Sequence, residues 1–268
     1  MSHFHTHGWV RIPGAFSANE AAAMRDVVWR ALASVGIRRD DSTTWRKERP
    51  DHLQHLKSDR VFQAVASSRT LSAIDEVLGG QPWERPSDWG ALFVLFPSRR
   101  PWHVPADGWH LDADYAGPLV PPKGVKVHAM FGDVVPRSGG MMIIDGSHRL
   151  VHRWFLDHPP KAGARGAELR ASVHRHPYVR DLCAAGEAVA RIERFCDRVE
   201  VVDGIPLQVL ENTATAGDVI LMHPLLLHAP PSTHLGSTPR FLLNKDIYLR
   251  SADDLRSADG ARGRRAPR

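Results

Sequence analysis

The chain has 268 residues, 43% of them hydrophobic and 24% charged, a composition typical of a globular protein with one well-buried domain. The net charge is +5, of which +2 lies in residues 251–268, so the surplus elsewhere is too small to indicate nucleic-acid binding. The two cysteines form no disulfide or zinc motif, and no segment has the pattern of a membrane span or an export signal. We expect a cytoplasmic protein that binds neither nucleic acid nor membranes and is a monomer or a homodimer.

The first eighty residues are predicted to form one strand and two helices. Residues 8–13 (GWVRIP) are apolar and β-prone. Ser17 and Glu20 then have the spacing of a capping box ahead of an Ala-rich helix. Residues 38–60 are polar and are expected to be rich in loops, whereas residues 61–78 have helical spacing and end at two glycines.

The rest of the chain predicts a mainly β fold with flanking helices and a jelly-roll core. Short apolar segments separated by proline and glycine indicate antiparallel strands, and no crossover helices alternate with them. We expect one domain over residues 1–250, a lid-like insertion at residues 151–208 and a disordered basic tail at residues 251–268. The predicted strands span residues 91–96, 108–112, 125–135, 140–144, 218–227 and 241–249.

Two segments contain residues that could bind a metal ion. His110 and Asp112 stand two apart, so in a strand both side chains project from one face and can share an ion. Such a pair alone has little specificity. Residues 216–228 (AGDVILMHPLLLH) include His223 and His228, which are five apart, so in a regular strand only one of the two can line the site.

A metal held by two histidines and a carboxylate has three open positions in octahedral coordination, which suits Fe(II) that activates O2. Arg240 follows His228 by twelve residues and can form a bidentate pair with a carboxylate of a bound molecule. Zn(II) also accepts two histidines and a carboxylate, so a hydrolytic zinc enzyme is a second hypothesis, although it leaves Arg240 without a role. A non-catalytic jelly-roll protein with a vestigial metal site is the third.

Taken together, these segments resemble the phytanoyl-CoA dioxygenase family over roughly residues 1–250. The resemblance rests on four motifs in the family's order, followed by Arg240. It implies a double-stranded β-helix core, Fe(II) as the metal, and 2-oxoglutarate and O2 as co-substrates that yield succinate and CO2. The motifs are GWVRIPG (8–14) with the capping box, WHLD (109–112), SGGMMIIDGSHR (138–149) and AGDVILMHPLLLH (216–228).

Carried over to this sequence, the resemblance implies that His110, Asp112 and His228 ligate the metal, since the family's spacing to Arg240 favours His228 over His223. Arg240 corresponds to the anchor of the distal carboxylate of 2-oxoglutarate. Two further residues are expected to contact 2-oxoglutarate: His128, at a position where relatives often have an aromatic residue, and Ser232, which two prolines displace from the family's serine position.

The presence of Asp112 favours hydroxylation over halogenation, because halogenating relatives replace the acidic ligand with a small residue. We therefore expect hydroxylation of an unactivated C–H bond in a small molecule, a natural-product or metabolic intermediate. Desaturation, epoxidation and ring formation are the alternative outcomes. Five residues near the motifs are candidates for contact with this substrate: Trp102, Trp109, Tyr115, Lys126 and Arg137.

Overall fold

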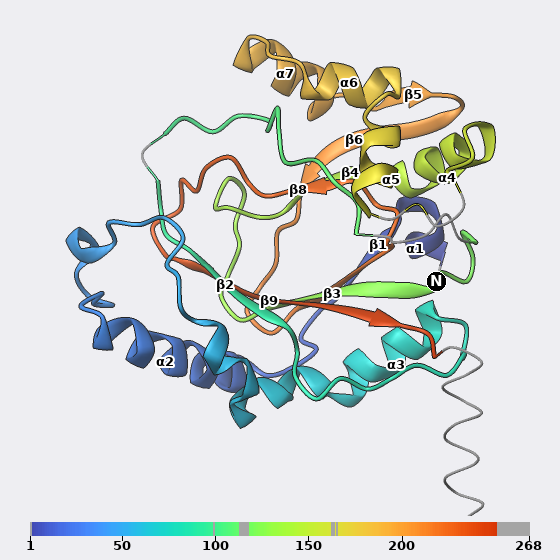
Figure 1. Cartoon of the computed structure of the whole chain (residues 1–268). Helices are drawn as coiled ribbons and strands as arrows, with labels where there is room; N and C mark the ends of the chain where they lie inside the picture. The colour runs from blue at the N-terminus through green and yellow to red at the C-terminus, as the bar shows by residue number, and fades with distance from the viewer. Residues whose placement is uncertain (1, 99, 113–117, 162–163, 165, 251–268) are drawn as a thin grey trace, which may run out of the picture.

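The computed structural model describes residues 2–250 except 99, 113–117, 162–163 and 165. Two antiparallel sheets face each other, with helices on the outer side of each (Figure 1). The strand orders are β1-β7-β3-β9-β2 in the five-stranded sheet and β5-β6-β4-β8 in the four-stranded sheet. The strands are β1 (Trp9–Ile12), β2 (Ala91–Leu95), β3 (Gly124–Met130), β4 (Met142–Asp145), β5 (Glu200–Val202), β6 (Ile205–Glu211), β7 (Val219–Met222), β8 (His228–Ala229) and β9 (Arg240–Tyr248). This arrangement confirms the predicted mainly β fold with a jelly-roll core.

Helices pack on both outer faces. The α-helices are α1 (Ser2–His7), α2 (Ala18–Ser34), α3 (Ser68–Val77), α4 (Ser147–Asp157), α5 (Gly166–Val173), α6 (Pro177–Cys183) and α7 (Ala188–Phe195), and the 3-10 helices are η1 (Ser42–Thr44), η2 (Gln54–Ser58) and η3 (Arg60–Ala66). One apolar cluster lies between the five-stranded sheet and α2 and α3, and a second between the four-stranded sheet and α4 to α7. A third, smaller cluster lies between the two sheets, so the space there is only partly filled by apolar side chains.

The predicted start of the fold is confirmed. Helix α2 begins after Ser17, whose hydroxyl accepts the Glu20 amide hydrogen while the Glu20 carboxylate accepts the Ser17 amide, a complete capping box. The helix predicted over residues 61–78 is interrupted, because Ser67 caps α3 with its side chain and separates it from η3. Both pieces still lie against the outer face of the five-stranded sheet.

Two strand predictions were wrong. Residues 108–112 form no strand: Gly108 has a positive φ of 75°, and His110 makes only a single antiparallel bridge to His228. Residues 218–227 do not form one strand either. β7 ends at Met222, a turn closed by the Leu226 amide donating to the His223 carbonyl at 2.9 Å follows, and β8 begins at His228.

The segment predicted as an insertion contributes to the framework. Residues 151–208 contain most of α4, then α5, α6, α7 and β5, and the first half of β6. These helices pack on the outer face of the four-stranded sheet, and β6 pairs with β4 inside that sheet. Whether any part of the segment moves as a lid stays a prediction, and the predicted tail at residues 251–268 lies outside the described residues.

The register of the five-stranded sheet decides which side chains face the space between the sheets. Lys126 on β3 lies opposite Met222 on β7 and Asp246 on β9, and the next inward rung places His128 opposite Ile220 and Asn244. Met222 and Ile220 belong to the apolar cluster between the sheets. Lys126 and His128 therefore point into the cup, because residues opposite one another in an antiparallel pair share a face.

Candidate metal centre

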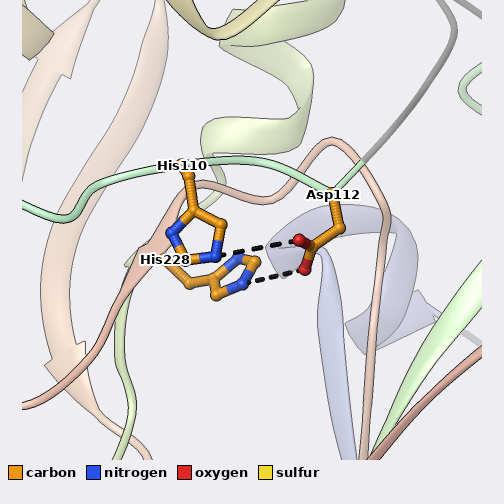
Figure 2. Close-up of side chains that lie close together, drawn as sticks. All are labelled: His110, Asp112 and His228. Carbon is orange, nitrogen blue, oxygen red and sulfur yellow. Dashed lines mark ion pairs between the residues drawn. The ribbon is translucent and has the colours of Figure 1, made fainter. Parts of the chain in front are cut away.

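Three side chains converge inside the cup. His110, Asp112 and His228 each offer one ligand atom, and these atoms lie within 4.8 Å of one another (Figure 2). Nε2 of His228 is 3.0 Å from Oδ2 of Asp112, and Nε2 of His110 is 3.7 Å from Oδ1 of the same carboxylate. Within the described residues, this is the one group of three or more His, Cys, Asp or Glu side chains with such spacing.

Both histidines present the nitrogen that a metal needs. The Nδ1 of His110 lies 2.7 Å from the Gly108 carbonyl, and the Nδ1 of His228 lies 3.0 Å from the Leu226 carbonyl. A carbonyl only accepts, so each Nδ1 must hold the proton in a neutral ring, which leaves Nε2 with its lone pair directed at the centre. Each backbone carbonyl therefore selects the ligand tautomer.

The charge states of His110 and Asp112 suit a dication. Burial, together with the positive charge that His228 can take, lowers the pKa of His110, which keeps its ring neutral at physiological pH. Burial alone would raise the pKa of the Asp112 carboxyl. The hydrogen bond and charge of His228 and then the charge of Lys126 outweigh this, and they hold the pKa of Asp112 well below its usual range. The site thus offers two imidazole rings and one carboxylate, a set that fits Fe(II).

His223, the competing distal ligand, lies elsewhere. Its Nδ1 accepts the Leu225 amide hydrogen and its Nε2 is 3.2 Å from the Leu119 carbonyl, while its ring packs near Phe4 and His148. Strand alternation predicted that only one of His223 and His228 lines the site, but the turn after Met222 is what separates them in space.

Arg240 lies at the start of β9 as a buried cation. Its Nη1 donates to the Gly139 carbonyl at 2.6 Å, and its Nε is buried without a hydrogen-bond partner in the described part of the chain. Burial and the charge of Arg49 lower the pKa of Arg240 to about 10, so the guanidinium stays charged near neutral pH. A buried cation with an unmet donor is costly unless an anion joins it, which fits a bound carboxylate.

The loop that supports Arg240 was missed by the sequence reasoning. Glu211, at the end of β6, accepts the Gly140 amide hydrogen at 2.7 Å and also that of Arg137. These bonds fix the turn that presents the Gly139 carbonyl to Arg240. The SGG sequence marked the turn, but no sequence pattern linked it to a carboxylate about seventy residues further on.

His128 is fully buried, and neither of its ring nitrogens has a hydrogen-bond partner among the described residues. Burial, followed by the charge of Lys126, lowers the pKa of His128 well below 6.5, so the ring is neutral. It lies on the inner face of the five-stranded sheet, on the rung next to Lys126. An unpartnered neutral imidazole there can give or accept one hydrogen bond with a bound molecule.

The other residues that were predicted to contact 2-oxoglutarate or the substrate lie in several different environments. The Ser232 hydroxyl donates to the His103 carbonyl at 2.6 Å and so is used by the backbone. Trp109 is buried in the cluster beside the four-stranded sheet, where its Nε1 donates to the Pro105 carbonyl at 2.9 Å. The exposed Arg137 guanidinium lies over the Trp102 ring at 5.3 Å. Lys126 contacts Asp112 directly, at 2.7 Å, and Tyr115 lies outside the described residues.

Comparison with known proteins identifies a family for this chain. A family model described as phytanoyl-CoA dioxygenase (PhyH) matches residues 4–194. This range includes His110 and Asp112 and ends before Arg240 and before His228, which the fold brings to the other two candidate ligands. No curated protein sequence matches the chain.

Several solved structures share the fold at low sequence identity. The epimerase SnoN, in complex with Fe3+, alpha ketoglutarate and nogalamycin RO, is 19% identical over 92% of this chain and 81% of that chain, with a TM-score of 0.54. AviO1 from Streptomyces viridochromogenes Tue57 is 14% identical over 94% of both chains, with a TM-score of 0.53. HygX from Streptomyces hygroscopicus, with nickel, 2-oxoglutarate and hygromycin B bound, is 18% identical over 92% and 84%, with a TM-score of 0.50.

The family match spans well over half of the chain and agrees with the jelly-roll fold. The resemblance seen in the sequence motifs is thereby confirmed. This chain belongs to the phytanoyl-CoA dioxygenase family of oxygenases that depend on iron and 2-oxoglutarate.

Proposed function

We propose that this protein hydroxylates an unactivated C–H bond of a ring-bearing natural product, with Fe(II) held by His110, Asp112 and His228. The single observation behind the proposal is the convergence of two imidazole Nε2 atoms and one carboxylate within 4.8 Å. Iron bound there supplies O2 activation coupled to decarboxylation of 2-oxoglutarate into succinate and CO2. The protein's own side chains bind and orient the reactants and exclude water.

The carboxylate ligand supports oxygen insertion. Asp112 is present, ionised and directed at both histidines, so the position that a halide takes in halogenating relatives is filled here by a carboxylate. Desaturation, epoxidation or ring formation would use the same residues and differ in how the substrate is held. Of these outcomes, hydroxylation places the fewest requirements on how the pocket holds the substrate.

We assign the distal carboxylate of 2-oxoglutarate to Arg240. Its unmet Nε donor and its charge in a buried position support this assignment. His128 is placed to give a further hydrogen bond to the same molecule, since it lies inside the cup with both nitrogens unpartnered. We propose that Ser232 only supports the neighbouring loop, because its hydroxyl already donates to the His103 carbonyl.

The substrate class is suggested by an exposed aromatic residue at the edge of the five-stranded sheet. Phe93 on β2 lies opposite Leu242, a member of the cluster between the sheets, yet its side chain is 42% exposed. An exposed aromatic ring on the inner face at the sheet edge would contact an apolar ring of a substrate. The SnoN and HygX structures contain nogalamycin RO and hygromycin B, and a natural product of comparable size is our proposal for this chain.

The cellular setting is part of the same proposal. No helix in the described portion of the chain is long and apolar enough to cross a membrane. Burial raises the pKa of both Cys183 and Cys196, which suits unreactive thiols in a reducing compartment. We propose a cytoplasmic monomer or homodimer that binds a small molecule and no nucleic acid.

The test is anaerobic addition of Fe(II) and then 2-oxoglutarate to the apoprotein. We expect a weak metal-to-ligand charge-transfer band and, on admitting O2, succinate release even without substrate. A screen of ring-bearing natural products should then raise succinate release and yield a product heavier by one oxygen atom. A missing band, together with an Asp112→Ala variant that behaves like the wild type, would refute the iron assignment.

The same experiment separates the two other hypotheses. A zinc hydrolase would be active after reconstitution with Zn(II) and would produce no succinate. A non-catalytic binding protein would bind the metal and 2-oxoglutarate without converting 2-oxoglutarate into succinate. Succinate release that requires Fe(II) and O2 excludes both.

A further inference from the structure

Lys126 is a buried lysine whose ammonium group lies close to three side-chain oxygens. Its Nζ lies 2.7 Å from Oδ2 of Asp112, 3.0 Å from Oδ1 of Asn244 and 3.1 Å from Oδ1 of Asp246. The residue is 5% exposed. The contact with Asn244 is a hydrogen bond, and the contacts with Asp112 and Asp246 are ion pairs. Lys126 is thus engaged by the protein itself, although its position in the sequence made it a candidate for substrate contact.

The sheet itself builds this arrangement. Lys126 on β3 and Asp246 on β9 are directly opposite in the antiparallel register, and Asn244 is the next inward-facing residue on β9. Asp112 reaches the same ammonium from the segment after the His110 bridge. Two acceptors are therefore fixed on a central strand pair, and the third belongs to the metal centre.

We propose that Lys126 is a positioning residue, which holds the Asp112 carboxylate beside the two histidines that would bind the metal. The inference rests on the proposed iron site. Lys126 contacts Oδ2 of Asp112, which also lies 3.0 Å from Nε2 of His228, while Oδ1 lies 3.7 Å from Nε2 of His110. Asp246 and Asn244 keep the ammonium in place, because a buried lysine is otherwise costly and mobile.

Lys126 also balances charge. Asp112 and Asp246 are both carboxylates, and Lys126 is the cation that lies between them. Without it, the pair would attract a dication at least as strongly but would repel 2-oxoglutarate, which is a dianion. Lys126 thereby lets a site with two acidic groups accept an acidic co-substrate.

The test uses Co(II) as a spectroscopic probe, so it needs no turnover. We expect Lys126→Met to bind Co(II) no more weakly than the wild type, but with an altered visible d–d spectrum. Its anaerobic Kd for 2-oxoglutarate should rise by at least about tenfold, the lower end of the usual effect of losing a residue that supports a metal ligand. If Lys126→Met does not fold, Lys126→Gln, which keeps a donor, replaces it.

A double variant separates charge from position. Lys126→Met/Asp246→Asn restores the charge balance without restoring the contact to Asp112. It should recover most of the affinity for 2-oxoglutarate while the Co(II) spectrum stays altered. The matched control is Lys245→Met, which removes a lysine from the same region of the sheet but on the outer face, where Lys245 lies near Asp88. We expect this control to leave both measurements unchanged.

The outcomes distinguish this inference from the proposed function. If the wild type binds Co(II) no better than Asp112→Ala does, the proposed metal centre itself fails. If the wild type binds Co(II) and Lys126→Met gives the same spectrum and the same Kd for 2-oxoglutarate, the metal centre stands and the positioning role of Lys126 is overturned.

Discussion

His110 and His228 exchange both of their backbone hydrogen bonds. The His110 amide donates to the His228 carbonyl at 2.9 Å, and the His228 amide donates back to the His110 carbonyl at 3.0 Å. This single bridge brings together two residues that are 118 positions apart and sets their rings at a centroid distance of 4.2 Å. The relative position of the two histidines in the proposed metal centre is therefore fixed by main-chain hydrogen bonds.

Removal of the carboxylate is expected to abolish metal binding. Asp112→Ala deletes the ionised group that lies between the two histidines. Isothermal titration with Mn(II) should show a loss of affinity larger than the roughly 10–100-fold typical of residues that only support a ligand. Asp133→Ala, which removes an exposed carboxylate that accepts the Ala216 amide hydrogen, is the control and should bind Mn(II) normally. Equal affinity in both variants would contradict the assignment.

Arg240→Met should weaken the binding of 2-oxoglutarate without weakening the binding of the metal. Loss of one partner of a buried charged pair typically costs about 2–5 kcal/mol, which is roughly 30-fold to several thousand-fold in Kd. Anaerobic titration of the charge-transfer band measures this change directly. The metal Kd, measured without 2-oxoglutarate, should stay within about twofold, a difference below 0.5 kcal/mol. An unchanged Kd for 2-oxoglutarate would mean that another cation holds its distal carboxylate.

The alternation of side chains along a strand accounts for several residues on the sheet side of this site. Lys126 and His128 share a face on β3, and alternation from Arg240 along β9 would also have found Asn244 and Asp246. The sequence could not predict that Asp246 meets Lys126, since that depends on the register between two strands about 120 residues apart. Register follows from the packing of the whole sheet, not from local pattern.

The segments at the centre itself were harder to predict than the sheet. His110 was expected in a strand, but Gly108 breaks the extended conformation and only one bridge forms. His228 was favoured over His223 by its spacing to Arg240, and the assumption of regular alternation between the two does not hold, because a turn follows Met222. These candidate metal ligands lie in irregular backbone, where periodicity gives least guidance.

Trp109 is expected to stabilise the fold without contacting the substrate. It is buried against the four-stranded sheet, and its Nε1 donates to the Pro105 carbonyl. Trp109→Phe should lower the free energy of unfolding by about 1–3 kcal/mol through the lost hydrogen bond and volume. Urea unfolding measures the loss, and succinate release without substrate should be unchanged at 20 °C. A variant of normal stability that loses substrate-stimulated turnover would restore the substrate-contact interpretation.

The capping box at the start of α2 gives a test remote from the site. Ser17→Ala removes the hydroxyl that accepts the Glu20 amide hydrogen, and we expect a loss of about 1 kcal/mol in the free energy of unfolding. Ser34→Ala, near the other end of the same helix, removes a hydroxyl that donates to the Ala31 carbonyl and should cost less. Equal losses in the two variants would mean that the capping hydroxyl adds no more to the free energy of unfolding than an ordinary helix hydroxyl does.

His223 is expected to make the fold sensitive to acid. Burial, followed by the charge of His148 and opposed by the Leu119 carbonyl, lowers the pKa of His223 to about 3 from the usual 6.5. Between these two values the unfolded chain binds a proton that the native ring does not. Stability is therefore complete above pH 6.5 and falls with acidification, by about 1.4 kcal/mol per pH unit for this one group.

His223→Asn removes the titration and keeps an acceptor for the Leu225 amide. Urea unfolding at pH 6.0, 5.5 and 5.0 should show a pH slope smaller by about 1.4 kcal/mol per unit than that of the wild type, whatever the absolute loss of stability. His52→Asn is the control, since His52 is exposed and its positive φ of 64° suits asparagine, and it should leave the slope unaltered. A parallel slope in His223→Asn would place the acid sensitivity on other groups, with His148, whose burial lowers its pKa to about 4, the next to replace.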